Sequence, residues 1–289
     1  MNLLISSIVL LNTQVLKKMS ERERHFFLQE SRKQIYTVKY LPDAKLDNSL
    51  GVILCKPIWG ERIRTHLIFS NLARFLSDKG FTVITCDYFG DSNSGGETCD
   101  LNYFSMVDDI EILHSYMLRS YDVKGCYLVG LRLGANVAMS VECRLSRINK
   151  LVLFEPVKDP KALFKKALRA NLATQMAVHK KIIQTREQLI QDLQDDKLVN
   201  IDGFVIGKDF WQSFEQISPF IAESTFDKQV VFYSMIPPGK KGSNFSTLSE
   251  CYKNSSIKNI EQEFDWTGWK SYVATPKLFF EAVDGELKI

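Results

Sequence analysis

The chain has 289 residues, a length that suits one large domain with an insertion or two smaller domains. Hydrophobic residues make up 45% and charged residues 25% of it, which excludes a disordered, collagen-like or disulfide-scaffold protein. With 37 Lys and Arg against 34 Asp and Glu, the net charge of +3 does not indicate nucleic-acid binding. Only four histidines occur, so any histidine-dependent reaction has to use His25, His66, His114 or His179.

The first residues contain a short apolar stretch, residues 3–11, followed by Lys17-Lys18. This stretch is too short to cross a bilayer, and no other segment approaches that length, so we expect no transmembrane segment. A signal peptide is the weaker alternative, since a basic start and a cleavage site are missing. We interpret residues 1–20 as a disordered extension or as a start codon placed too early, with Met19 as the true start.

The six cysteines show no zinc-ligand spacing, and three of them, Cys55, Cys86 and Cys126, lie in apolar runs. This pattern indicates reduced thiols in a cytoplasmic protein and predicts no metal site. The segment 239–243 lacks the spacing of a phosphate-binding loop, and we expect no cofactor. Ser243 is instead predicted to cap a helix.

Short apolar strands alternate with amphipathic helices along most of the chain. Nearly continuous apolar strands between helices predict a mostly parallel sheet with helices on both faces, an α/β fold. The predicted elements are a hairpin at 24–28 and 34–40, strands at 51–55, 81–86, 125–129, 150–154, 229–235 and 257–264, helices at 65–79, 106–117, 133–145, 243–254 and 276–283, and loops at 56–64 and 87–100.

Residues 157–224 interrupt this alternation with two long helical stretches and an aromatic segment at 204–220. We predict a helical cap of residues 157–224 inserted into a core formed by residues 21–156 and 225–289. Open α/β sheets bind ligands beyond the carboxyl ends of their strands, where such a cap would lie. Within it, Lys161, Lys165 and Arg169 share one helical face, either as a solvated surface or as a funnel for acidic ligands.

The segment Gly130-Leu131-Arg132-Leu133-Gly134 lies between a predicted strand and a predicted helix. This is the place of the Gly-x-Ser-x-Gly nucleophile elbow, whose glycines permit a tight turn that exposes the middle residue. Here the middle residue is Arg132. A guanidinium stays protonated and has no lone pair to donate, so Arg132 cannot act as the nucleophile that accepts an acyl group.

The elbow and three further segments resemble the α/β-hydrolase superfamily, its serine-aminopeptidase-like branch, and in particular the bacterial exosortase A system-associated hydrolases. Residues 130–135 match the Gly-Leu-Arg-x-Gly-Ala form of these proteins, and residues 56–62 are similar to their His-Pro-Phe-Gly-Glu loop, which supplies an oxyanion-hole amide. Residues 87–92 resemble a shortened Asp-Tyr-x-Gly-x-Gly-Asp-Ser segment, and residues 153–156 resemble the strand end before the cap. The resemblance implies an α/β-hydrolase fold from about residue 24 to 287 and a link to bacterial exopolysaccharide gene clusters.

The resemblance also implies which catalytic residues are missing. In the family, the general-base histidine follows the last strand, but the last histidine of this chain is His179. Glu155 or Asp265 could take the place of the catalytic acid. We therefore predict a non-catalytic accessory or binding protein, in effect a pseudoenzyme. The alternative is an active ester or thioester hydrolase or acyltransferase with a non-standard site, and a homodimer or partner-docking module built on the cap is a third possibility.

The cleft of this fold is expected to bind a small acidic or acylated molecule, such as a carboxylate or phosphate on a sugar or lipid-linked sugar. A guanidinium beside the free Leu133 N–H of a helix N-terminus makes an anion site. The competing interpretation is an internal ion pair of Arg132 with Glu155, Asp87 or Glu61, because a buried arginine needs a partner. The two interpretations are compatible if the internal ion pair opens when the anion binds. The expected cleft residues are Ile58, Trp59, Glu61, Asp87, Arg132 and Leu133.

A role in ligand binding or catalysis has weaker support for the four tryptophans and for His66. The four tryptophans either stack on a sugar or pack the cap on the sheet. His66 is interpreted as a packing residue near a helix N-terminus rather than as a base, because it lacks a catalytic partner. The tryptophans are Trp59, Trp211, Trp266 and Trp269.

Overall fold

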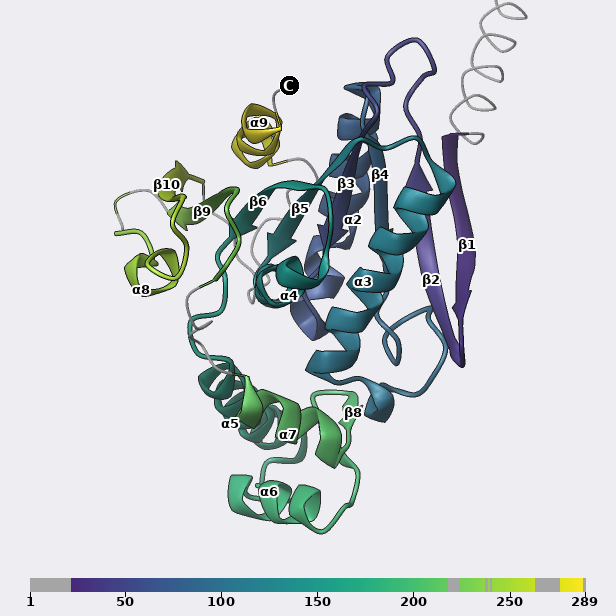
Figure 1. Ribbon diagram of the computed structural model, residues 1–289. Coiled ribbons are helices and arrows are strands. Elements are labelled where there is room, and N and C mark those ends of the chain that lie inside the picture. The colour runs from purple at the N-terminus through teal and green to yellow at the C-terminus, as the bar shows by residue number, and fades with distance from the viewer. Residues whose placement is uncertain (1–21, 218–223, 237–238, 240, 263–275, 288–289) are drawn as a thin grey trace, which may run out of the picture.

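The computed structural model describes residues 22–217, 224–236, 239, 241–262 and 276–287. Within these residues, eight strands form one sheet in the order β1-β2-β4-β3-β5-β6-β9-β10 (Figure 1). β1 and β2 run antiparallel to their neighbours, and the other pairs are parallel. The strands are β1 (Glu23–Glu30), β2 (Lys33–Tyr40), β3 (Leu50–Cys55), β4 (Thr82–Cys86), β5 (Gly125–Leu131), β6 (Ile148–Phe154), β9 (Gln229–Ile236) and β10 (Ser255–Glu261).

Helices cover both faces of this sheet and create two hydrophobic cores. α3 (Tyr103–Ser120) and α4 (Leu133–Val141) pack on one face, and α2 (Trp59–Asp78) and α9 (Lys277–Glu286) pack on the other (Figure 1). β4 is buried along its whole length because both sides of a covered sheet lie in a core, and the hydroxyl of its buried Thr85 donates to the Leu54 carbonyl at 3.0 Å. The predicted fold class, a mostly parallel sheet with helices on both faces, is confirmed.

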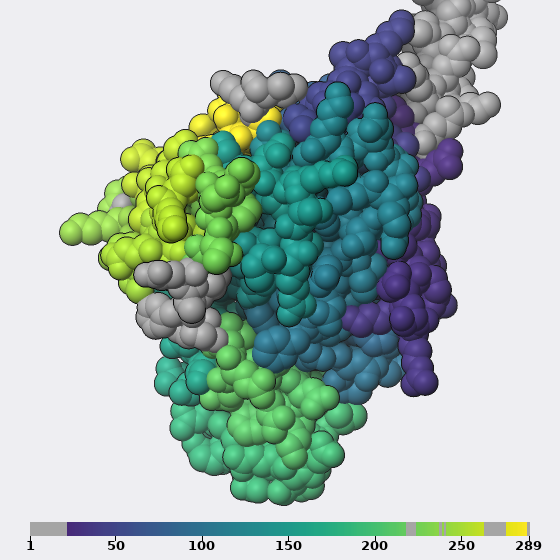
Figure 2. Space-filling model, viewed as in Figure 1, coloured from purple at the N-terminus to yellow at the C-terminus, as the bar shows by residue number. Residues whose placement is uncertain are grey.

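A separate group of elements connects β6 to β9, and we call it the cap. It contains α5 (Pro160–His179), α6 (Arg186–Gln194), the hairpin of β7 (Val199–Ile201) and β8 (Phe204–Ile206), and α7 (Lys208–Gln216). The cap projects from the sheet as a lobe (Figures 1 and 2). Its interior is aromatic, with the rings of Phe210 and Phe214 stacked at a centroid distance of 4.7 Å and Phe164 beside both.

Three predicted helix boundaries are corrected by the structure. α2 begins at Trp59, inside the expected loop 56–64, and Gly60 lies in its first turn. α4 ends at Val141 and a short 3₁₀ turn, Glu142–Arg144, follows it. The expected helix 243–254 is reduced to α8 (Ser246–Ser249), and Ser243 does not cap it, because its hydroxyl bonds to Glu155.

Residues 1–20, on which the prediction of an N-terminal extension rests, lie outside the described residues. None of the helices in the described part of the chain is both long and apolar enough to span a membrane.

Candidate functional site

Arg132 is the single residue between the end of β5 and the start of α4. Its backbone has φ 55° and ψ −125°, a conformation that costs a non-glycine residue about 1–3 kcal/mol. Close backbone packing around the turn requires both neighbouring glycines. A Cβ on Gly134 would lie 2.2 Å from the carbonyl oxygen of Cys55, and one on Gly130 would lie 2.5 Å from the Cα of Ala135. The strained elbow predicted from the sequence is therefore formed, with an arginine at its apex.

The Arg132 side chain forms an internal ion pair. Its Nε donates to Oε1 of Glu61 at 3.0 Å, and its Nη1 donates to the backbone carbonyl of Glu155 at 3.2 Å. The side chains of Arg132 and Glu61 remain 20% and 16% exposed, so the pair lies at the edge of solvent. Of the three carboxylates expected as partners, Glu61 is the one that binds Arg132.

The Glu155 carboxylate is occupied by other donors. It accepts hydrogen bonds from the Ser234 hydroxyl at 3.0 Å, the Met235 N–H at 2.7 Å and the Ser243 hydroxyl at 2.9 Å. These bonds tie the end of β6 to β9 and to the loop after it. Glu155 therefore clamps the backbone beneath the elbow, and only its carbonyl contacts Arg132. Asp265, the other expected acid, lies outside the described residues.

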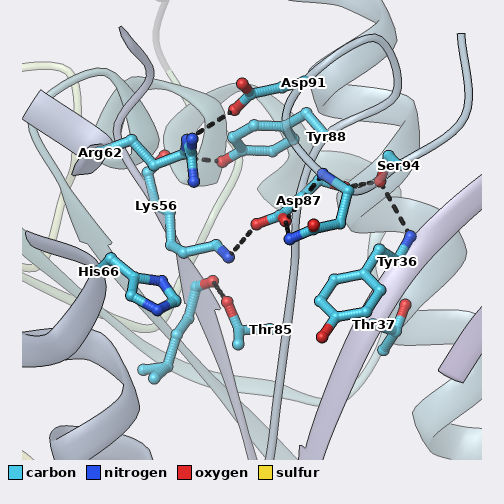
Figure 3. A network of polar contacts seen from close by, with 12 residues as sticks. Tyr36, Thr37, Lys56, Arg62, His66, Thr85, Asp87, Tyr88, Asp91 and Ser94 are labelled. Carbon is cyan, nitrogen blue, oxygen red and sulfur yellow. Dashed lines mark hydrogen bonds and ion pairs between the residues drawn. The ribbon is translucent and has the colours of Figure 1, made fainter. Parts of the chain in front are cut away.

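Asp87 belongs to a buried charge network next to the cleft (Figure 3). Its carboxylate bonds to the Lys56 ammonium at 2.6 Å and accepts from the Asn93 amide at 2.9 Å, and both Lys56 and Asp87 are buried. Burial acts to raise the pKa of Asp87, but the charge and hydrogen bond of Lys56 outweigh it and hold the pKa below its usual value. A second pair, Arg62 with Asp91 at 3.2 Å, lies beside the first. These charges neutralise one another, and Asp87 does not line the pockets described below.

The four histidines have other partners or positions than Arg132. His25 contacts Tyr36 and Glu23 on the β1–β2 hairpin, and His179 ends α5. His114 is buried against the Ser146 carbonyl. His66 lies on α2 near Lys56 (Figure 3), where burial and the Lys56 charge lower its pKa and favour the neutral ring. None of the four lines either of the two pockets described next.

Two pockets meet at Arg132. The first has a volume of about 240 Å³ and the second a volume of about 290 Å³, and both are lined by apolar and charged residues. Both are lined by Arg132 together with Leu163 and Lys166 of α5. Five of the six expected cleft residues line the first pocket, namely Ile58, Trp59, Glu61, Arg132 and Leu133.

The sequence reasoning missed the contribution of α5 to these pockets. Leu163, Lys166, Ala167 and Ala170 line the first pocket and recur at intervals of three and four residues, the spacing of one helical face. Lys161, Lys165 and Arg169, which were considered as a funnel for acidic ligands, are at other positions of α5. Lys161 forms an ion pair with Glu215 at 3.6 Å. The spacing of Leu163, Lys166, Ala167 and Ala170 in the sequence was the signal that could have identified this face.

Trp59 connects the first pocket to the cap. Its indole stacks on Phe210 at a centroid distance of 4.9 Å and on Phe204 at 5.8 Å. Trp211 is partly buried against the same core. These two tryptophans therefore pack the cap on the sheet, whereas Trp266 and Trp269 lie outside the described residues.

Comparisons with known proteins agree with this architecture. Residues 63–216 match the family model described as serine aminopeptidase, S33. Est1E from Butyrivibrio proteoclasticus, solved with ferulic acid bound, is 16% identical with a TM-score of 0.62, over 91% of this chain and 97% of that one. Mouse alpha/beta hydrolase domain-containing protein 10 is 12% identical with a TM-score of 0.59, over 91% and 98%.

An esterase from Pyrococcus furiosus is 14% identical with a TM-score of 0.57, over 92% of this chain and 88% of that one. A comparison with curated protein sequences gives no significant match. At these identities the similarity establishes the α/β-hydrolase fold.

Proposed function

The chain belongs to the serine aminopeptidase S33 family, and from this premise we propose that it is a non-catalytic member that binds an amphipathic anion in the cleft beside Arg132. The observation that carries the proposal is the guanidinium at the apex of the elbow, between two pockets. The resemblance of residues 130–135 to the exosortase A system-associated hydrolases supports an accessory role in bacterial surface-polysaccharide synthesis, and the free cysteines support a cytoplasmic location.

The chemistry of the elbow disfavours hydrolysis. Acyl transfer through a Ser–His–Asp mechanism needs a nucleophile and a base within hydrogen-bond reach. Arg132 supplies neither, and the sequence contains no histidine after His179. Loss of one triad residue alone costs several orders of magnitude in rate. The backbone of the elbow is nevertheless retained at its energetic cost, which supports a role for this conformation in binding.

The surroundings of Arg132 suit an anion with an apolar part. The guanidinium lies at the N-terminus of α4, whose partial positive charge favours anions. Lys166 adds a second cation that lines both pockets. The first pocket is lined by Ile58, Leu133 and Leu163 among others. Because a cavity of about 150 Å³ accepts benzene, the larger first pocket can accept a short alkyl or aromatic group.

In this proposal, Glu61 is a competitor for the ligand. In the unliganded protein its carboxylate forms the internal ion pair with Arg132. On binding, the anionic group of the ligand takes the place of the Glu61 carboxylate. Residues 157–224 act as an inserted cap, whose helix α5 closes the cleft over the core of residues 21–156 and 225–289.

Calorimetric titration with octyl phosphate and with uncharged octanol tests the binding proposal. We expect saturable binding of octyl phosphate and at least tenfold weaker binding to the Arg132→Met variant, because a charge-assisted hydrogen bond is lost. Arg144→Met is the matched control, since Arg144 forms an exposed ion pair with Asp108. Equal affinity of the wild type and Arg132→Met for octyl phosphate would refute the proposal.

The non-catalytic part is tested separately with p-nitrophenyl butyrate and an acyl thioester. We expect no turnover above the buffer rate by the purified protein. Turnover that follows the protein through purification and disappears in Arg132→Met would show an active enzyme with a non-standard site.

A further inference from the structure

The helix α5 and the turn after it carry an unusual charge distribution. Between Asp159 and Glu187 the chain contains seven lysines and arginines and no aspartate or glutamate. The chain as a whole is nearly balanced, so the positive charge is concentrated on this element. The basic residues are Lys161, Lys165, Lys166, Arg169, Lys180, Lys181 and Arg186.

The far end of the same element exposes large apolar side chains. We call residues 176–183 the cap tip. Its four large apolar residues are Met176, Val178, Ile182 and Ile183, which are 46%, 66%, 49% and 54% exposed. Lys180 and Lys181 lie between them in the sequence and are also exposed. The cap tip therefore exposes apolar and cationic side chains within eight consecutive residues.

This surface is held in place by a specific turn. The Gln175 side chain accepts hydrogen bonds from the N–H groups of Ile183 at 2.7 Å and Gln184 at 3.0 Å, and donates to the Gln184 carbonyl at 3.2 Å. Lys180 ends α5 in the left-handed conformation with φ 58°. Because the turn is already ordered, a partner that covers the two isoleucines does not have to pay for ordering the backbone.

The first two acidic residues after the cap tip in the sequence, Glu187 and Asp192, form ion pairs. Asp192 accepts from the Gln184 amide and pairs with Lys197 at 2.8 Å. Glu187 pairs with Arg186 at 2.7 Å. Each of these two carboxylates is therefore paired with a cation outside the cap tip, and the cap tip itself contains Lys180 and Lys181 and no acidic residue.

We propose that the cap tip docks on the surface of an anionic lipid bilayer. Basic residues around exposed apolar side chains are the composition that binds in the interface of such membranes. Insertion of the valine and isoleucines buries apolar area, while the lysines attract the headgroups. The proposal is independent of the anion site at Arg132. Where both hold, α5 connects the membrane surface to the two pockets that it lines.

Co-sedimentation of the full chain with vesicles tests this docking. The vesicles contain phosphatidylcholine alone or an equimolar mixture with phosphatidylglycerol. We expect binding to the mixed vesicles only. The double variant Lys180→Gln with Lys181→Gln should bind these vesicles roughly 30-fold more weakly, because each lysine contributes about fivefold to the affinity. Ile182→Ser with Ile183→Ser should weaken it at least about tenfold through lost apolar burial.

Matched controls use residues of similar exposure far from the cap. These are Leu46→Ser with Phe27→Ser, and Lys45→Gln with Lys124→Gln, all of which should bind as the wild type does. Equal binding of the cap-tip and control variants would overturn the proposal, and so would equal binding to both vesicle types. If Ile182→Ser with Ile183→Ser converts a dimer to a monomer and leaves vesicle binding unchanged, the surface is a contact between copies and the proposal is wrong.

Discussion

Substitution of Glu61 by Gln should increase the affinity of the cleft for anions. In the unliganded protein the Glu61 carboxylate holds the Arg132 Nε at 3.0 Å, and an incoming anion has to displace it. Two unit charges about 4 Å apart attract each other by roughly 4 kcal/mol at an effective dielectric constant of about 20. Much of this attraction is offset by lost hydration, because the side chains are only 20% and 16% exposed.

We expect that displacing Glu61 costs the ligand about 1.4 kcal/mol of binding free energy. Glu61→Gln should therefore bind octyl phosphate roughly tenfold more tightly. The estimate lies between that of an exposed pair, up to about 1 kcal/mol, and the larger effect of breaking a buried one. Isothermal titration calorimetry at low and high salt measures it, and the gain should shrink with salt. Glu215→Gln, which breaks the exposed pair with Lys161, is the control and should leave the affinity unchanged. Unchanged or weaker binding by Glu61→Gln would refute the reasoning.

Three further predictions concern stability and reactivity. Gly134→Ala should lower the free energy of unfolding by about 3 kcal/mol or more in urea titration, because its Cβ would lie 2.2 Å from the Cys55 carbonyl oxygen, in rigid backbone. Burial raises the pKa of Glu142, whose Oε2 has no partner among the described residues. Glu142→Gln should therefore stabilise the protein by about 1 kcal/mol at pH 7, and the gain should vanish below about pH 4, where the wild-type carboxyl is protonated in both states. In the native protein a thiol reagent should label exposed Cys143 quickly and buried Cys55 only after unfolding, since burial raises the pKa of Cys55 well above its usual value. Equal labelling rates would contradict this.

Several features of the fold could be predicted because they depend on local sequence pattern. A strand that is buried on both faces is rich in apolar and β-branched residues, so β4 and β5 were identifiable without tertiary information. The elbow was identifiable for a related reason. Two glycines flank Arg132 at the junction of a strand and a helix, and only glycine permits the close backbone approach found there. The sequence also determines that an arginine, and not a serine, cysteine or aspartate, occupies this position.

Helix ends were less predictable, because they depend on tertiary contacts. The Ser243 hydroxyl was available to cap a helix, but a buried carboxylate from β6 bonds to it instead. The face of α5 was ambiguous for a similar reason. Its lysines repeat on more than one face, and packing of Phe164 and Leu168 in the cap core turns Lys166 toward the pockets.

The choice of partner for Arg132 shows where sequence information ends. The sequence determined that an arginine stands at a helix N-terminus and that a partly buried guanidinium needs an acceptor. It offered Glu61, Asp87 and Glu155, which belong to three different connections. Only the tertiary structure decided among them, because Asp87 pairs with Lys56, and the Glu155 carboxylate accepts hydrogen bonds from hydroxyl and amide donors instead. Charge and residue type limit the possible ion pairs, but the distances between loops distant in sequence select the one that forms.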